Sequence, residues 1–199
     1  MAQEVRTPVQ QRSIDKKHRI IEAGYDLFAK NGYFNTNTSE IAKKAGVSTG
    51  IVYGYFRDKR DILVEVLDVY VNKVFSPVLK MLDDLSAPID FETIITHAVD
   101  GTVEIHKENA AIHEALYSLS PTDKAVRDKF MKLENDMTLR IVERLRAANY
   151  DRKDIFERVH LAFETIQSYA HECVYDKHPY IDYPTMRTIV ISMLIPVFI

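Results

Sequence analysis

The sequence has one cysteine, Cys173, among its 199 residues. A single cysteine excludes a disulfide within the chain and also a zinc site built from several cysteines. Chains without disulfides are typical of reducing compartments, so we expect a cytoplasmic protein.

Long apolar runs are also missing. The most apolar stretch, residues 189–199, is interrupted by Ser192 and Pro196 and is much shorter than the roughly 20 residues that span a bilayer. No basic segment followed by an apolar one opens the sequence, so we expect neither a secretion signal nor a membrane partner. This apolar stretch is expected to lie in a protein interface.

Strand-like alternation of apolar and polar residues does not extend beyond four residues, and repeats and low-complexity tracts are absent. Apolar residues instead recur at three- and four-residue spacing through most of the chain. These patterns predict an all-α fold.

The charge is unevenly distributed. The formal net charge is −3, yet residues 1–60 carry 11 Lys and Arg against 6 Asp and Glu, whereas the remainder carries 15 against 23. A basic module joined to an acidic one favours a nucleic-acid partner for the first module only.

Helix start and stop signals divide the basic module into three helices. The first begins near Ser13 and ends at Asn31-Gly32. Asn37 and Glu40 have the spacing of a capping box at the start of the second helix, and Gly46 is expected to end this helix. Ser48 can cap the third helix. Two short helices joined by a glycine-containing turn outline a helix-turn-helix.

A long helix is predicted from Asp58, followed by helices at about 89–107, 109–118, 122–148 and 151–176 and a last one after Pro184. We therefore expect a flexible arm at residues 1–12, a helix-turn-helix DNA-binding domain at 13–57 and a larger helical domain at 58–199.

The third helix has the composition of a recognition helix. A short helix that enters the major groove needs hydrogen-bonding side chains on one face. Ser48 and Thr49 supply hydroxyls, Tyr53 and Tyr55 supply long, stiff donors, and Gly50 lets backbone approach the duplex. The tyrosines could instead simply pack against neighbouring helices.

The stretch "IIEAGYDLFAKNGYFNTNTSEIAKKAGVSTGIVYGYFRDKRDIL", residues 20–63, resembles the DNA-binding domain of the tetracycline-repressor-like (TetR/AcrR) family of bacterial transcription factors. The resemblance rests on many residues that match the family's pattern and occur in the same order along the chain. They are Ala23, Leu27, Phe28, Gly32, Tyr33, Thr36, Glu40 to Ala42, Ala45 to Ser48, Gly50, Tyr53, Tyr55, Phe56 and Lys59.

The resemblance implies a homodimer whose N-terminal helices bind a near-palindromic operator in double-stranded DNA. Carried over position by position, it implies DNA contacts from Asn37, Ser39, Ser48, Thr49, Gly50, Tyr53, Tyr55 and Lys59. The charges of Lys43 and Lys44 lie near the same surface, and we include Lys44 among the DNA-binding residues. Many family members have histidine, tyrosine or asparagine at the position of Gly54, so no side-chain contact is assigned there.

The resemblance also implies a small-molecule pocket in the second domain, and its apolar composition suits an apolar or amphipathic ligand. Aromatic and methionine side chains on helices are usually core, but some can line a cavity, and buried polar groups can orient a ligand. The predicted ligand-binding residues are Tyr70, Phe75, His97, His113, Tyr117, Met137, Phe163, Gln167 and His171.

Family members pair through their last two helices. In this chain these are the helices at about 151–176 and 184–198, whose apolar residues would otherwise be exposed. The predicted dimer-interface residues are Ile189, Val190, Met193, Leu194 and Val197.

We predict a ligand-responsive transcriptional repressor rather than an enzyme, with no cofactor and no metal. Glu157 and His160 form one E-x-x-H pair, but a di-iron bundle needs a second pair and two further glutamates, which the pattern lacks. The alternatives are a helical-bundle enzyme with an attached DNA-binding domain and a helical adaptor regulated by a partner protein.

Overall fold

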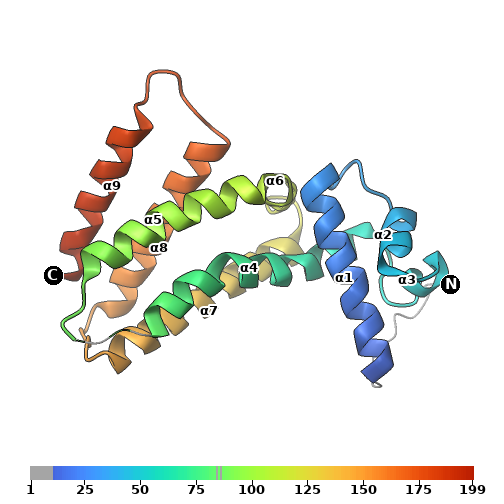
Figure 1. Cartoon of the computed structure of the whole chain (residues 1–199), viewed down its shortest axis with the longest axis horizontal. Helices are drawn as coiled ribbons and strands as arrows, with labels where there is room; N and C mark the ends of the chain where they lie inside the picture. The colour runs from blue at the N-terminus through green and yellow to red at the C-terminus, as the bar shows by residue number, and fades with distance from the viewer. Residues whose placement is uncertain (1–10, 84, 86) are drawn as a thin grey trace. The chain divides into compact units, whose positions relative to one another are not determined.

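A computed structural model describes residues 11–83, 85 and 87–199, excluding the side chains of residues 74, 75, 77, 78 and 81. Within this part every regular element is a helix, as the periodicity predicted (Figure 1). None of the described helices combines the length and apolar character needed to cross a bilayer. The helices are α1 Gln11–Asn31, α2 Thr38–Ala45, α3 Thr49–Tyr53, α4 Lys59–Asp83, α5 Phe91–Glu108, α6 Ala110–Leu119, α7 Lys124–Ala147, α8 Ile155–Val174 and α9 Tyr183–Phe198.

The chain forms two compact units. Unit 1 comprises residues 1–72 and 111–130, and unit 2 comprises residues 73–110 and 131–199. The helices α4 and α7 contribute to both units because each crosses a boundary between them. Residues 1–10 of the predicted arm lie outside the described part, whereas Gln11 and Arg12, which were also predicted to belong to the arm, are the first two residues of α1. The predicted domain boundary after residue 57 stays a prediction.

Unit 1 is built on local signals that the sequence displays. The Asn37 side chain accepts a hydrogen bond from the backbone of Glu40, whose carboxylate accepts one from the backbone of Asn37, so the predicted capping box is confirmed. Gly46 then ends α2 with φ of 66°, a left-handed conformation that glycine adopts without steric cost. Ser48 caps α3 through its side chain, as predicted.

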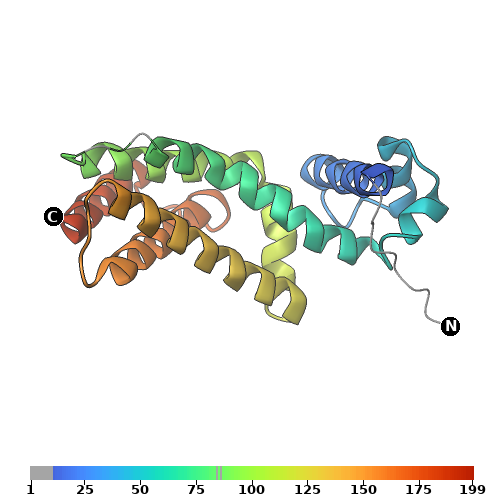
Figure 2. The same cartoon turned by 90° about the horizontal axis from the view of Figure 1, so that it is seen from below.

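The core of unit 1 joins α1 to α2 and to the first half of α4. Figure 2 shows α2 and α3 beside α1. Phe28, Ile41 and Val52 are fully buried. Gly24 allows α1 to approach α4, because a Cβ added there would lie 2.8 Å from Cγ2 of the buried Ile62.

In unit 2, α5, α8 and α9 pack on one another. Val99, Ile155 and Val159 form the centre of their shared apolar core. At the surface, Arg187 on α9 donates two hydrogen bonds of 2.6 Å to the Asp100 carboxylate on α5. Such bidentate pairs add geometric specificity, so this pair helps to orient α9.

Candidate nucleic-acid interface and ligand cavity

Several predicted recognition residues on α2 and α3 and in the turn between them are exposed. Ser39, Ser48 and Gly50 are exposed, and the Tyr53 side chain is 40% exposed although its neighbour Val52 is fully buried. Thr49 is half-buried beside them. The burial of Val52 therefore turns a hydroxyl-rich face outward, which suits contacts to phosphates and base edges.

Tyr55 lies differently from Tyr53. Its hydroxyl is 2.7 Å from the Ser13 hydroxyl on α1, and the two side chains are partly buried. The phenol therefore connects α1 to the segment after α3. A DNA contact by Tyr55 stays a prediction, and such a contact would have to share this hydroxyl with Ser13.

Lys59 packs into the turn between α1 and α2. Its Nζ donates hydrogen bonds of 2.7 Å to the carbonyl oxygens of Tyr33 and Thr36 and lies 4.3 Å from the centre of the Tyr33 ring. Burial lowers the pKa of Lys59. These carbonyls use two of the three N–H donors of the ammonium, so the predicted phosphate contact has at most one donor available.

Two further predicted contacts also have partners within unit 1. The Asn37 side chain is used as the cap of α2, although the residue is exposed. The Lys44 Nζ lies 3.0 Å from the Asp26 carboxylate on α1. Both side chains of that ion pair are about half exposed, so the pair contributes little to stability and can rearrange toward a phosphate.

Gly54 adopts an ordinary right-handed helical conformation, with φ of −72° and ψ of −21°. The backbone conformation therefore does not require glycine at this position. A Cβ there would lie 3.2 Å from the carbonyl oxygen of Ile51, within its own turn of helix.

Behind the interface, α4 is joined to the start of α7 by an ion pair. The Arg60 guanidinium donates two hydrogen bonds to the Asp123 carboxylate, one of them 2.6 Å from Nη2 to Oδ1. This bidentate contact lowers the pKa of Asp123 to about 2. Sequence reasoning missed the pair because 63 residues separate its members.

Unit 2 contains a cavity of about 90 Å³ lined by residues of α4, α5, α7, α8 and α9. Among the residues that the structure describes, the wall is apolar apart from Thr102 and Gln167 and includes no charged side chain. The lining residues are Leu82, Phe91, Ile94, Ile95, Ala98, Thr102, Ile141, Leu145, Val159, Ala162, Phe163, Ile166, Gln167 and Phe198. Such a wall suits an apolar ligand or the apolar part of a larger one.

The predicted ligand-binding residues are scattered. Phe163 and Gln167 lie in the cavity wall. Met137 is buried elsewhere in unit 2, while His97 is exposed and His171 lies 3.4 Å from Asp176. Tyr70, His113 and Tyr117 belong to unit 1, where the His113 ring lies beside both tyrosines, and the Phe75 side chain is outside the described part.

Residues 20–66 match the family model described as bacterial regulatory proteins, tetR family. Over these residues the chain matches the TetR family. Its N-terminal part is 36% identical over 76 residues to the HTH-type transcriptional regulator HbdR of Aromatoleum sp. strain CIB. That match covers 38% of this chain and 33% of HbdR, so the chain matches only about a third of that relative's length.

Solved structures resemble most of the chain in fold. A transcriptional regulator from Saccharomonospora viridis in complex with choline has a TM-score of 0.66 at 19% identity, covering 89% of this chain and 94% of that one. FadR of Bacillus subtilis in complex with stearoyl-CoA has a TM-score of 0.59 at 21% identity, covering 89% and 96%. The curated relatives HbdR and AcrR are named as transcriptional regulators, which supports the prediction that this chain is a regulator and not an enzyme.

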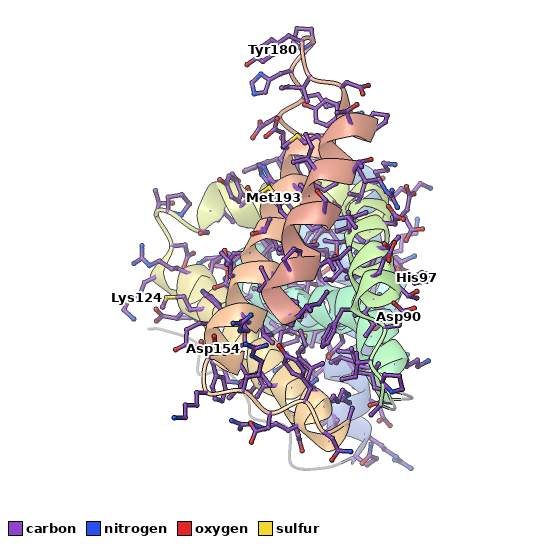
Figure 3. The ribbon with its side chains drawn as sticks, turned by 90° about the vertical axis from the view of Figure 1, so that its left-hand side faces the viewer. Asp90, His97, Lys124, Asp154, Tyr180 and Met193 are labelled. Carbon is purple, nitrogen blue, oxygen red and sulfur yellow. The ribbon has the colours of Figure 1, made fainter. Side chains whose placement is uncertain are left out.

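The predicted dimer residues of α9 divide into two sets. Ile189 and Met193 are 50% and 62% exposed, and Figure 3 shows Met193 on the outer side of α9. Val190 and Leu194 are buried within unit 2, and Val197 is half-buried. The expectation that all five would be exposed without a partner is therefore wrong for Val190 and Leu194, because α9 packs this side on α5 and α8.

Proposed function

We propose that the chain is a homodimeric transcriptional repressor that binds operator DNA and is released by a small-molecule ligand. The observation that carries the proposal is the exposed face formed by Ser39, Ser48, Gly50 and Tyr53 on a TetR-family domain. In this proposal Tyr53 and the hydroxyls at residues 48 and 49 contact the operator, while nearby lysines contribute positive charge.

Dimerisation places two such faces on one operator. A two-fold dimer presents its recognition helices to successive major grooves about 34–36 Å apart, which accounts for a near-palindromic site. Exposed apolar side chains on the last two helices support the pairing: Leu161 on α8 is 54% exposed, in addition to Ile189 and Met193 on α9. Burial of such side chains against a second copy is the ordinary way to stabilise a permanent dimer.

Ligand response is supported by the apolar cavity in unit 2. Two proteins of the same fold were solved with choline and with stearoyl-CoA, respectively. A ligand can release DNA only if it binds the DNA-free arrangement more tightly than the DNA-bound one. We therefore expect saturating ligand to weaken operator binding without competing for the DNA-binding face.

A salt titration of binding to the DNA immediately upstream of the chain's own gene tests the proposal. We compare the wild type with Tyr53→Ala and use Tyr180→Ala, at a 78% exposed tyrosine of the loop between α8 and α9, as the control (Figure 3). Wild type and control should bind a palindrome tightly and lose affinity as salt rises, whereas Tyr53→Ala should lose about 5- to 150-fold. Equal affinity for the upstream DNA and random DNA would contradict sequence-specific regulation.

A further inference from the structure

One end of the cavity in unit 2 is closed by an aromatic cluster. The rings of Phe91 and Phe198, which both line the cavity, stack with their centres 5.1 Å apart. The Tyr150 ring packs on both, at 5.0 Å from Phe91 and 6.3 Å from Phe198. Tyr150 therefore lies directly behind this end of the cavity.

The end of α7 fixes the position of Tyr150. Asn149 adopts a left-handed conformation with φ of 63°, and the Tyr150 N–H donates to the carbonyl oxygen of Leu145, another residue of the cavity wall. The Asn149 N–H donates to the carbonyl oxygen of Arg146. This pair of bonds is the Schellman motif, which folds the chain back so that the residue after the left-handed one packs on the last turn.

Two buried hydrogen-bonding atoms at this end have no partner among the described residues. They are the Tyr150 hydroxyl and the Arg158 Nε. Arg158 lies close by, because its Nη1 donates to the carbonyl oxygen of Val197, the residue before Phe198. Its Nη2 lies 2.7 Å from the Asp154 carboxylate. A buried polar group without a partner is costly, so a ligand that satisfies both atoms would gain free energy at this place.

The chemistry of the two atoms defines what they can bind. The Arg158 Nε–H can only donate, and the tyrosine hydroxyl can donate as well, so together they suit an acceptor oxygen. Asp154 raises the pKa of Arg158 through its hydrogen bond, and Tyr150 raises it further. Because Asp154 already balances the guanidinium charge, a neutral carbonyl oxygen suffices. A quaternary ammonium group suits these atoms poorly, since it offers no oxygen to the Arg158 Nε–H and no N–H to the tyrosine oxygen.

We propose that the cavity binds a short fatty acyl group, with its hydrocarbon chain among the apolar side chains and its carbonyl oxygen hydrogen-bonded by the Tyr150 hydroxyl and the Arg158 Nε–H. In this proposal the half-buried ring of Phe91, which lines the cavity and packs on Tyr150, turns aside to admit the carbonyl oxygen. The inference rests on the proposed ligand-responsive function. The volume of about 90 Å³ favours chains of a few carbons, since an apolar cavity of about 150 Å³ holds one benzene.

Calorimetric titration of the full chain with butanoic acid, methyl butanoate and butyltrimethylammonium tests this site. The acid, the ester or both should bind, and the preferred compound identifies the source as a free or an esterified acyl group. In a series from butanoic to octanoic acid, affinity should rise by up to about fourfold per methylene until the cavity is filled. Equal binding of butyltrimethylammonium, or no binding of butanoic acid and methyl butanoate, would overturn the proposal.

Tyr150→Phe removes only the hydroxyl and should weaken acyl binding about two- to tenfold while the protein remains folded. Tyr180→Phe, at the exposed loop position, is the matched control and should bind as the wild type does. Ala98→Leu fills the cavity and should abolish binding. Unchanged binding in both Tyr150→Phe and Ala98→Leu would place the ligand elsewhere.

Operator release, followed separately by fluorescence anisotropy, separates the two proposals. If acyl compounds bind but operator affinity does not change, the proposed ligand response is refuted and the proposed acyl-binding site stands. Release by other compounds, without acyl binding, refutes the acyl site and keeps the regulatory function.

Discussion

The ammonium group of Lys59 is hydrogen-bonded to the carbonyl oxygen of Tyr33 at 2.7 Å, although 26 residues separate them. The same Nζ reaches the carbonyl of Thr36, and the Thr36 hydroxyl donates to the carbonyl of Gly32 at 2.9 Å. The first turn of α4 is thereby tied to the turn between α1 and α2. The spacing between the helix-turn-helix and α4 depends on this contact.

Lys59→Met should lower the free energy of unfolding by about 1–3 kcal/mol, because two partly buried carbonyls lose charge-assisted hydrogen bonds. Urea denaturation measures the change. Lys43→Met is the control, since Lys43 is exposed on α2, and it should stay within about 0.5 kcal/mol of the wild type. An equally small effect for both variants would mean that Lys59 has no structural role.

The two glycines at positions 24 and 101 should respond in opposite ways to alanine. Gly24→Ala places a Cβ 2.8 Å from Ile62 and should cost about 1–3 kcal/mol of stability through overpacking. Gly101→Ala, inside α5, meets nothing within 4 Å and should gain up to about 1 kcal/mol from helix propensity. Thermal unfolding of both variants checks this, and a stabilising Gly24→Ala would contradict the close approach of α1 and α4.

The Arg60–Asp123 pair should make stability sensitive to acid. The pKa of Asp123 falls from 3.8 to about 2 on folding, so its contribution is present above pH 4 and is lost as the pH falls toward 2. Asp123→Asn lacks this contribution. Between pH 4 and pH 2 the wild type should therefore lose on the order of 1 kcal/mol more than the variant, after allowance for solvent screening.

Urea titrations at several pH values measure the difference. Asp128→Asn, at an exposed position on α7, is the control and should follow the wild type. Parallel pH curves for wild type and Asp123→Asn would show that the ion pair contributes nothing to folding.

Thr138→Val should stabilise unit 2 by about 1 kcal/mol. The Thr138 hydroxyl oxygen is buried and has no hydrogen-bond partner among the described residues, and valine has nearly the same shape without the polar atom. Thr165→Val is the matched control, because the Thr165 hydroxyl donates to the carbonyl of Leu161 at 2.7 Å, and it should not stabilise. A loss of stability in Thr138→Val would indicate that a buried water satisfies this hydroxyl.

The sequence by itself determined the helical fold class, the caps of α2 and α3 and the family of the N-terminal helices. These features depend on residues a few positions apart, such as Asn37 and Glu40, whose hydrogen bonds form within one turn. A repeating apolar pattern likewise identifies which residues of a helix are buried, without reference to the rest of the chain.

Only the tertiary structure decided which helices these buried faces meet. It paired Lys44 with Asp26 and Tyr55 with Ser13, and it covered Val190 and Leu194 within unit 2 rather than leaving them to a second copy. The cavity draws its wall from five helices, so no single helical pattern could identify it. Periodicity reports the burial of one face, whereas contacts across tens of residues depend on the packing of several helices at once.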